Sequence, residues 1–320
     1  MLRDEIGYFF RKIFGKTDLD SWKDTWGRID WGSKEEYDSK KIERQIRSML
    51  KRGANPNTAN PKDSRSTPLH LVAKRIRCSS SIAPLLEAGA EVDKKDALGK
   101  TPLSYAYLSI PNDDKIRIQM TLFSVCGADY VRTSEEKTSV HTPKKGNFLA
   151  LLEAGADINT QDNNGKTLLM HIRPSAAFPK LLLECGADPD KQDNAGKTAL
   201  MHWANQPPYT TDRSGTVYDA TEGIRLLAKN CSDVNTQDNL GNTALIYARF
   251  IPENFSLLLD AGVDPNIPNK QGKTIFSQNL SDYVKRILEK HQKNPQQKKT
   301  TSHHLDISHE FKKDKANERS

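Results

Sequence analysis

A 21-residue segment that occurs twice constrains the fold of this 320-residue chain more than any other feature. Residues 151–171 return 31 positions later as residues 182–202, and 15 of the 21 positions are identical. Self-similarity at a period of about 20 to 50 residues is typical of repeat arrays, in which each unit packs only against its neighbours. The length of the chain therefore predicts a number of repeats rather than a number of separate globular domains.

Each repeat carries a signal for the start of a helix and a signal for its end. Thr67 and Thr101 are each followed by a proline, and a capping hydroxyl before a proline predicts that a helix begins there. Glycines follow the apolar stripes of the second helices, where a helix end favours a residue that accepts the left-handed conformation. These glycines are Gly89, Gly127, Gly155, Gly186 and Gly262.

Turn-forming residues lie between the end of one helix pair and the start of the next. The sequence Asp162-Asn-Asn-Gly165 predicts a tight hairpin. This turn, the Gly-Ala-Asp and Gln-Asp-Asn-x-Gly-Lys-Thr elements of both copies, and the sequence Thr-Pro-Leu-His at 67–70 resemble the ankyrin repeat. The resemblance covers about residues 36–290. It implies an all-α ankyrin-repeat solenoid of helix pairs joined by β-hairpin-like turns.

Aligning the threonine that opens each unit predicts about seven helix pairs. They open at Thr67, Thr101, Thr138, Thr167, Thr198, Thr243 and Thr274. We expect an N-terminal aromatic capping segment at 1–33 and the repeat array at 34–290, which begins with a lone outer helix at about 33–51. The polar residues 291–320 carry seven basic and four acidic side chains and predict a disordered basic tail.

Two units depart from the pattern. The third is degenerate, and Pro143 and Gly146 interrupt its first helix, which predicts a short helix and a weak joint. The fifth spans 45 residues, and its extra residues fall between Trp203 and Glu222. Cys231 stands where the other units have the capping glycine. If Cys231 adopted the left-handed conformation there, the folded chain would be destabilised by about 1 to 2 kcal/mol.

Aromatic and apolar residues in the N-terminal segment allow two interpretations. They either cover the open apolar end of the array, as a terminal cap does, or form a patch that docks a partner or a membrane surface. Charge does not favour a membrane, because residues 1–33 carry six basic and six acidic side chains. The residues concerned are Leu2, Ile6, Phe9, Phe10, Ile13, Phe14, Trp22, Trp26 and Trp31.

Composition argues against a membrane-spanning or secreted chain. No apolar run is long enough to span a bilayer or to form a signal peptide. Neighbouring repeats lie about 10 Å apart, too far for a disulfide between units. The four cysteines, Cys78, Cys126, Cys185 and Cys231, fall in different units. We therefore expect free thiols, a monomer, and a cytoplasmic location in the chain's own cell or in another.

The ionisable residues of the repeats predict no catalytic or metal site. His171 and His202 recur because the unit recurs, and repeats about 10 Å apart place them beyond the reach of one zinc ion. Asp162, Asp193 and Asp238 form a ladder of turn residues. No glycine-rich phosphate loop, paired carboxylates or Cys-His arrangement is present. The sequence predicts neither an enzyme nor a cofactor.

Positive charge is concentrated near the start of the array. Residues 34–80 carry 12 lysines and arginines against five acids. This basic surface is either a solvated face or a site for an acidic protein, a phosphoinositide or a nucleic acid, although no stacking aromatics support the last. Its predicted members are Arg44, Arg47, Lys51, Arg52, Lys74, Arg75 and Arg77.

In ankyrin-repeat proteins the hairpin tips and inner helices line a concave groove that binds partner proteins. The resemblance implies such contacts at the tips from Lys94, Leu98, Asn164, Ala195, Leu240 and Gln271. On the inner helices it implies Tyr105, Tyr107, His171, Arg173, His202, Trp203, Tyr247 and Arg249. Tyr, Trp and Arg dominate interface energetics. Packing is the alternative role for Tyr105, His171, His202 and Tyr247, because that position is partly buried in the family.

The insertion adds Tyr209, Arg213 and Tyr218 as recognition candidates, because loop insertions in repeat arrays often lie on the binding face. A neutral loop is the alternative, since lengthening a loop costs little entropy.

The last unit and the tail close the sequence. In the last unit Gln278 and Asn279 replace small residues, and its second helix, at about 282–290, is charged on the open side, as expected of a terminal cap. Ankyrin proteins that intracellular bacteria inject into host cells also end in a polar tail. The resemblance implies a protein-interaction scaffold, and more narrowly a translocated effector whose tail is an address. A solvated spacer is the alternative for the tail.

Overall fold

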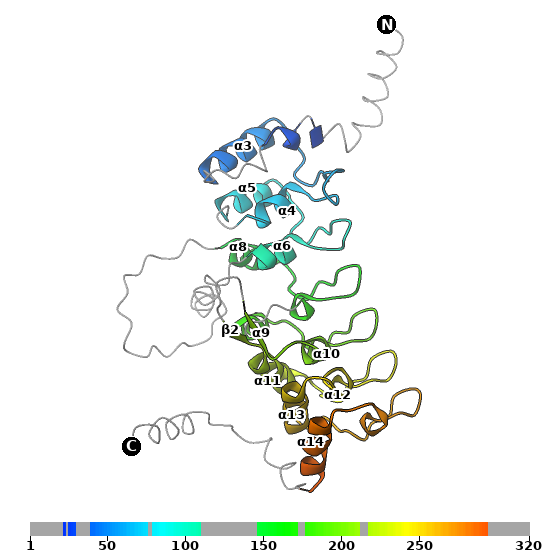
Figure 1. Cartoon of the computed structure of the whole chain (residues 1–320). Coiled ribbons are helices and arrows are strands. Elements are labelled where there is room, and N and C mark those ends of the chain that lie inside the picture. Colours follow the sequence, from blue (N-terminus) through cyan, green and yellow to red (C-terminus); the bar gives the residue numbers. More distant parts are fainter. Residues whose placement is uncertain are drawn as a thin grey trace, which may run out of the picture. The chain divides into compact units, whose positions relative to one another are not determined.

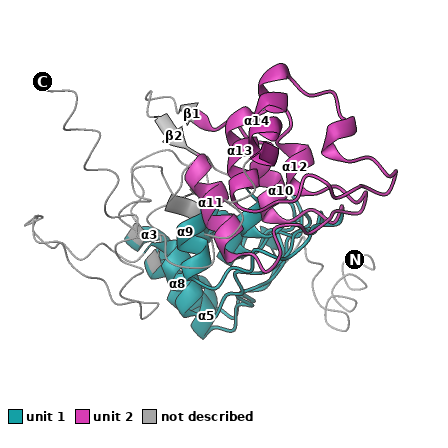
Figure 2. Cartoon of the chain, turned by 90° about the horizontal axis from the view of Figure 1, so that it is seen from below, with its two compact units in different colours: residues 1–173, 177–194 teal, residues 174–176, 195–320 magenta. Residues whose placement is uncertain are grey.

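The computed structural model describes residues 22–23, 25–29, 39–75, 79–109, 146–171, 177–211 and 217–293. Within these ranges the regular structure is helical except for one two-stranded hairpin (Figure 1). The all-α prediction is confirmed. The chain divides into two compact units, which Figure 2 colours separately. Unit 1 comprises residues 1–173 and 177–194, and unit 2 comprises residues 174–176 and 195–320.

Unit 1 is built from pairs of short helices. The inner helix of a pair follows the opening threonine, and the inner elements are α4 (Pro68–Ala73), α6 (Pro102–Ser109) and the 3-10 turn η3 (Leu168–Met170). The outer elements are α3 (Ser39–Lys51), η2 (Ser79–Ser81), α5 (Ile82–Glu87), α8 (Asn147–Glu153) and α9 (Ala177–Glu184). Inner helices α4 and α6 pack side by side, and α3 packs against α5.

Unit 2 repeats this arrangement. Its inner elements are α10 (Ala199–Ala204), α12 (Ala244–Tyr247) and the 3-10 turn η4 (Ile275–Ser277). Its outer helices are α11 (Thr221–Asn230), α13 (Pro252–Asp260) and α14 (Asp282–Lys293). Helix α10 packs against α12, and α13 packs against both α11 and α14.

In five of the units a leucine two residues after the opening threonine lies in the core. Leu69, Leu103, Leu169, Leu200 and Leu245 are each at most 4% exposed. The threonines before α4, α10 and α12 have extended backbones, so each helix begins directly after its threonine, as predicted. The glycines at the ends of α5, α8, α9 and α13 all have positive φ, which confirms the predicted helix stops. Gly127 lies outside the described residues.

The hairpin before η3 closes through one aspartate and one glycine. The Gly165 N–H donates to the Asp162 carbonyl at 2.9 Å, and the Asp162 N–H donates to the Lys166 carbonyl at 3.0 Å. Gly165 has a φ of 76°, and a Cβ built on it would lie 2.6 Å from the backbone nitrogen of Asn194. Only glycine fits this turn. The predicted tight hairpin is confirmed.

The insertion in the fifth unit forms a hairpin of its own. Strands β1 (Tyr209–Thr211) and β2 (Val217–Asp219) pair antiparallel, whereas the sequence predicted only an irregular loop. The next helix, α11, ends at Cys231 with φ −73° and ψ 150°. This backbone is extended rather than left-handed, so the strain expected at Cys231 does not arise. Cys185 and Cys231 are free thiols.

Two of the N-terminal tryptophans are buried. Trp22 is 6% exposed and Trp26 is fully buried, and the Trp26 indole N–H donates to the Asn55 carbonyl at 2.9 Å. These two rings therefore do not form an exposed docking patch. Trp31, the apolar residues at 2–14, Cys78 and Cys126 lie outside the described residues, as do 138–145 of the third unit and most of the tail. The number of repeats stays a prediction.

Candidate functional site

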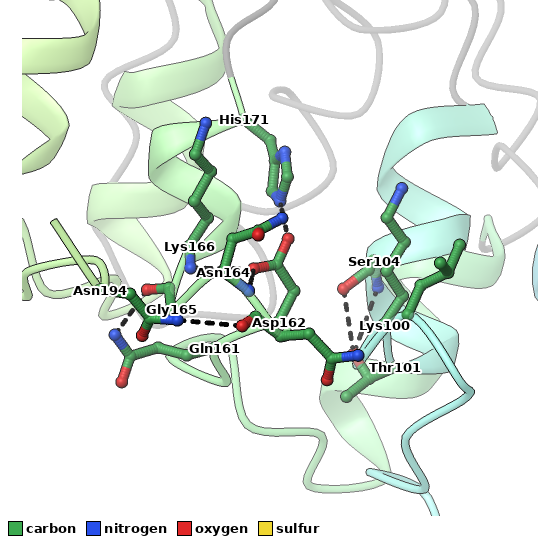
Figure 3. Close-up of polar contacts among 12 residues, drawn as sticks. Lys100, Thr101, Ser104, Gln161, Asp162, Asn164, Gly165, Lys166, His171 and Asn194 are labelled. Carbon is green, nitrogen blue, oxygen red and sulfur yellow. Dashed lines mark hydrogen bonds and ion pairs between the residues drawn. The ribbon is translucent and has the colours of Figure 1, made fainter.

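The inner side of unit 1 carries two aspartates that each hold a side chain of the following inner element. Oδ2 of Asp162 lies 3.0 Å from Nε2 of His171, while its Oδ1 accepts two N–H groups of the turn (Figure 3). In the unit that opens at Thr101, the Tyr105 hydroxyl donates to Oδ2 of Asp96 at 2.6 Å. The position four residues after the opening threonine thus fixes the hairpin onto its helix.

These contacts and their surroundings set the protonation of both side chains. Burial lowers the pKa of His171, and the positive charges of Lys100 and Lys166 lower it further, while Asp162 raises it. The imidazole is therefore neutral at pH 7. Burial raises the pKa of Tyr105, and its hydrogen bond to Asp96 raises it further. Neither group is poised to exchange a proton near neutral pH.

Lysines surround Tyr105 in unit 1. Nζ of Lys74 lies 4.4 Å from the ring centroid and Nζ of Lys100 lies 5.8 Å from it, both within the range of a cation–π contact. Lys74 is also paired with Asp63 at 3.1 Å. Within the described ranges, Lys100 and Lys166 have no carboxylate partner.

The inner side of unit 2 repeats the anchoring and adds an exposed aromatic. The Tyr247 hydroxyl donates to Oδ2 of Asp238, and Nζ of Lys197 lies 4.4 Å above the Tyr247 ring. The Arg249 guanidinium lies 4.4 Å from the centroid of the Phe250 ring. Phe250 is 67% exposed, so the Arg–Phe pair faces solvent.

Two hairpin tips present large apolar side chains to solvent. Leu98 is 50% exposed and Leu240 is 65% exposed. Each follows the turn aspartate by two residues and donates its N–H to that carboxylate, so the turn needs only the backbone at this position. Asn164, Ala195 and Gln271 are likewise exposed. The remaining predicted tip residue, Lys94, is half-buried and pairs with Glu91 at 3.0 Å.

Two predicted contact residues lie in the core instead. Tyr107 and Trp203 are each 1% exposed. Tyr107 packs near Phe148, with ring centroids 6.0 Å apart, and Trp203 packs against Gly223. This burial removes both from the predicted partner surface.

The other predicted contact residues differ in accessibility. Tyr209 is 58% exposed in β1, and Tyr218 lies opposite Thr210 in β2. His202 and Arg249 are half-buried. Arg173 and Arg213 lie outside the described residues.

Sequence reasoning missed three exposed aromatics, all in unit 2: Phe250, Phe276 (43% exposed) and Tyr283 (61% exposed). The repeat alignment could have found Phe276, because it occupies the position that holds the buried core leucine elsewhere. Its place in the last unit is the feature that distinguishes Phe276 from the buried leucines of the other units.

Several members of the predicted basic surface are already paired. Arg47 lies 3.0 Å from Glu43, Lys74 pairs with Asp63, and Arg44 donates to the Lys40 carbonyl at 3.2 Å. Lys51 and Arg52 are exposed, Arg75 is half-buried, and Arg77 lies outside the described residues. Glu43 and Asp63 are among the five acids of residues 34–80, so the two ion pairs leave the net charge of this surface unchanged, as does the Arg44 hydrogen bond.

The part of the chain that the structure describes contains no group of three or more His, Cys, Asp or Glu side chains placed to bind a metal ion. Of its helices, none has both the length and the apolar surface needed to cross a bilayer.

Comparisons with known proteins bear on the fold. The sequence matches no known protein-family profile and no curated protein. The structure is similar to the crystal structure of the ankyrin repeat domain of Bcl-3, a member of the IkappaB protein family, with a TM-score of 0.53 and 22% sequence identity. The similarity covers 79% of this chain and 93% of that one. The chain has the ankyrin-repeat fold, and the resemblance seen in its sequence is confirmed.

Proposed function

We propose that this chain is a protein-interaction scaffold, which binds a partner protein with its hairpin tips and inner helices. The observation that carries the proposal is the exposure of Leu98 and Leu240 at hairpin tips. Aspartate and glycine close these turns, so nothing in the hairpins themselves requires a leucine there. An exposed apolar residue on a rigid turn has little conformational entropy to lose when a partner covers it.

The inner helices supply complementary contacts beside the tips. Half-buried Tyr105, His171 and Tyr247 are held by aspartates, and the Arg249–Phe250 pair faces solvent. Tyrosine and arginine are enriched among residues that dominate binding energy, particularly where their geometry is fixed in advance. We therefore place the strongest contacts where tips and inner helices adjoin within each unit.

Affinity capture from a cell lysate tests this proposal. The full chain and its Leu98→Ser/Leu240→Ser and Arg249→Ser variants are immobilised at equal density, and bound proteins are identified by mass spectrometry. We expect a saturable partner whose retention falls about tenfold or more in the tip variant, because exposed anchors contribute on the order of 1 to 2 kcal/mol each.

The matched control changes exposed residues on the outer side of unit 2, Arg225→Ser/Lys229→Ser in α11. This variant should capture the partner as well as the original chain does. If the tip variant and this control lost the partner equally, or retained it equally, the tips and inner helices would not be the binding surface.

The location of that partner is a separate proposal. As an effector, the chain would meet it inside another cell, and residues 291–320 would direct the transfer. Fusing these residues to a reporter tests the address, and a reporter that stays inside a secretion-competent strain would leave the tail without this role.

A further inference from the structure

The last repeat of unit 2 exposes a side chain that every other repeat with a described inner element buries. Phe276 lies two residues after Thr274, and the equivalent Leu245, one repeat earlier, is 1% exposed. Phe276 is 43% exposed. In a repeat array each unit covers this position of its predecessor, so Phe276 marks the face on which a further unit would stack.

The outer helix of the same repeat also exposes apolar surface. Helix α14 buries Val284 and Leu288, and it packs against α13. Tyr283 is 61% exposed and Ile287 is half-buried, and their spacing of four residues places them on one face of the helix.

Alignment of the last two outer helices shows how the equivalent side chains are placed one repeat earlier. Residues 258–260, Leu-Leu-Asp, correspond to residues 287–289, Ile-Leu-Glu. Tyr283 and Ile287 therefore correspond to Asn254 and Leu258, both of which are fully buried in α13. Asn254 contacts the preceding repeat, where its side-chain amide donates to the carbonyls of Ala204 and Gln206. Phe276 and Tyr283 are thus two exposed aromatics at positions whose equivalents one repeat earlier are buried.

The chain that follows α14 contains one segment suited to cover these aromatics. In residues 294–320 the only large apolar side chains are Leu305, Ile307 and Phe311. They alternate with polar residues between 305 and 311, the pattern of an extended segment with one apolar face. The 11 residues at 294–304 can span about 36 Å, and α14, at 12 residues, is about 18 Å long. The segment therefore reaches back along the helix to Tyr283.

Charge also favours contact between this segment and helix α14. Asp306 and Glu310 lie within the segment, while Arg286, Lys290 and Lys293 of α14 are exposed. Placing two carboxylates beside this basic helix face brings opposite charges together as the apolar face is covered.

We propose that residues 305–311 fold back over the end of unit 2 and cover Phe276 and Tyr283, in the place where a further repeat would stack. The interaction is independent of partner binding at the hairpin tips.

Hydrogen exchange on the full chain tests this contact. The variant Leu305→Ser/Ile307→Ser/Phe311→Ser removes the apolar face of the segment, and Lys312→Ser/Lys313→Ser is the matched control beside it. We expect backbone amides of residues 275–290 to exchange roughly threefold to tenfold faster in the first variant and at the original rate in the control. Unchanged exchange in the first variant would overturn the proposal.

A reciprocal measurement uses the face itself. Tryptic cleavage at Lys312 and Lys313 should be several-fold faster in Phe276→Ser/Tyr283→Ser than in the original chain, with equal circular dichroism showing that both are folded. Equal cleavage rates would contradict the contact. Light scattering tests whether a second copy of the chain covers this face instead. A dimer that is lost in Phe276→Ser/Tyr283→Ser but kept in Leu305→Ser/Ile307→Ser/Phe311→Ser would show that it does, and would overturn the proposal.

Discussion

Oδ2 of Asp96 accepts a hydrogen bond of 2.6 Å from the hydroxyl of Tyr105, nine residues further along the chain. Oδ1 of the same carboxylate accepts the N–H groups of Leu98 and Lys100 at 2.8 and 2.9 Å. One aspartate thus closes the hairpin and ties it to the inner helix. The arrangement recurs at Asp162 with His171 and at Asp238 with Tyr247.

Removing this tie should destabilise the chain in proportion to the bonds lost. We expect Tyr105→Phe to lower the free energy of unfolding by about 1 kcal/mol, and Asp96→Ala, which removes three bonds, by about 2 to 4 kcal/mol. Urea denaturation measures both. Tyr209→Phe is the control, because the Tyr209 side chain is 58% exposed. A Tyr105→Phe variant as stable as this control would show that the bond contributes nothing.

The local features of this fold could be predicted from the sequence, whereas burial could not. Threonine caps, glycine stops and the hairpin at Asp162 depend on residues adjacent in the chain. The recurrence of a polar ring four residues after four of the opening threonines, at Tyr105, His171, His202 and Tyr247, was visible too. Whether such a ring packs or binds a partner depends on a carboxylate nine residues earlier in the chain. Only the folded hairpin brings this carboxylate close to the ring.

The candidate surface was predicted less well for the same reason. Trp203 looked like a contact residue because it lies on an inner helix, but its ring packs on Gly223, beyond the insertion. Phe276 matched a core position and was overlooked, because exposure there depends on its place at the end of the repeats. Nothing in the residue itself signals either outcome.

Gly223 should tolerate no side chain. Alanine is normally preferred to glycine within a helix by up to about 1 kcal/mol, but a Cβ here would lie 2.2 Å from Cζ3 of Trp203. We expect Gly223→Ala to lower the free energy of unfolding by about 1 to 3 kcal/mol. In a Trp203→Leu background the same change should be stabilising. Thermal or urea unfolding of the original chain, the two single variants and the double variant gives the coupling free energy between the two positions. Additive effects would contradict the packing of Trp203 on Gly223.

Cys231 should be a better residue than glycine at its position. Its φ of −73° suits any side chain. Cys231→Gly adds freedom to the unfolded chain and removes the hydrogen bond of 3.3 Å from the Cys231 thiol to the Ala228 carbonyl, so it should cost about 0.4 to 1 kcal/mol or more. Gly262→Ala is the comparison, since Gly262 has a φ of 93° with no atom within 4 Å of a Cβ built there. We expect it to cost about 1 to 2 kcal/mol. Stabilisation by Cys231→Gly would mean that the helix end is strained after all.

Asp93 occupies a place that asparagine fills in other repeats. Asn159 accepts the Asp188 N–H at 2.7 Å and donates to the Gly186 carbonyl at 3.0 Å. Asp93 accepts the Asp157 N–H at 3.1 Å but, when ionised, has no proton to donate. Burial raises the pKa of Asp93, and the charge of Asp157 raises it further, while the backbone N–H lowers it.

Asp93→Asn should therefore stabilise the chain by about 0.5 to 1 kcal/mol at pH 7, through a restored hydrogen bond. A raised pKa means that the unfolded carboxyl ionises first as pH rises above 3.8, so ionisation of Asp93 weakens folding only above that value. The advantage of the variant should shrink as pH falls toward 4. Urea denaturation at pH 4 and pH 7 measures this. Asn159→Asp is the reverse test and should be destabilising at pH 7.

His70 should make stability depend on pH in the opposite direction. Its Nδ1 accepts the Thr67 N–H at 3.1 Å, and its Nε2 lies 3.0 Å from the Lys100 carbonyl, so the buried ring is neutral with its proton on Nε2. Burial lowers the pKa of His70, and Lys74 lowers it too, while the Lys100 carbonyl and Asp96 raise it.

The unfolded histidine takes up a proton first as pH falls below 6.5, so the stability that the neutral His70 contributes is full above that pH and is lost below it. We expect the free energy of unfolding to fall between pH 7 and pH 5, and to fall less steeply in His70→Gln, whose amide can accept from Thr67 and donate to Lys100. Burial lowers the pKa of His171 as well, so His70→Gln/His171→Gln should flatten the dependence further. Urea denaturation at pH 5, 6 and 7 gives the slopes, and an unchanged slope in His70→Gln would show that this ring is protonated equally in the folded and unfolded chains.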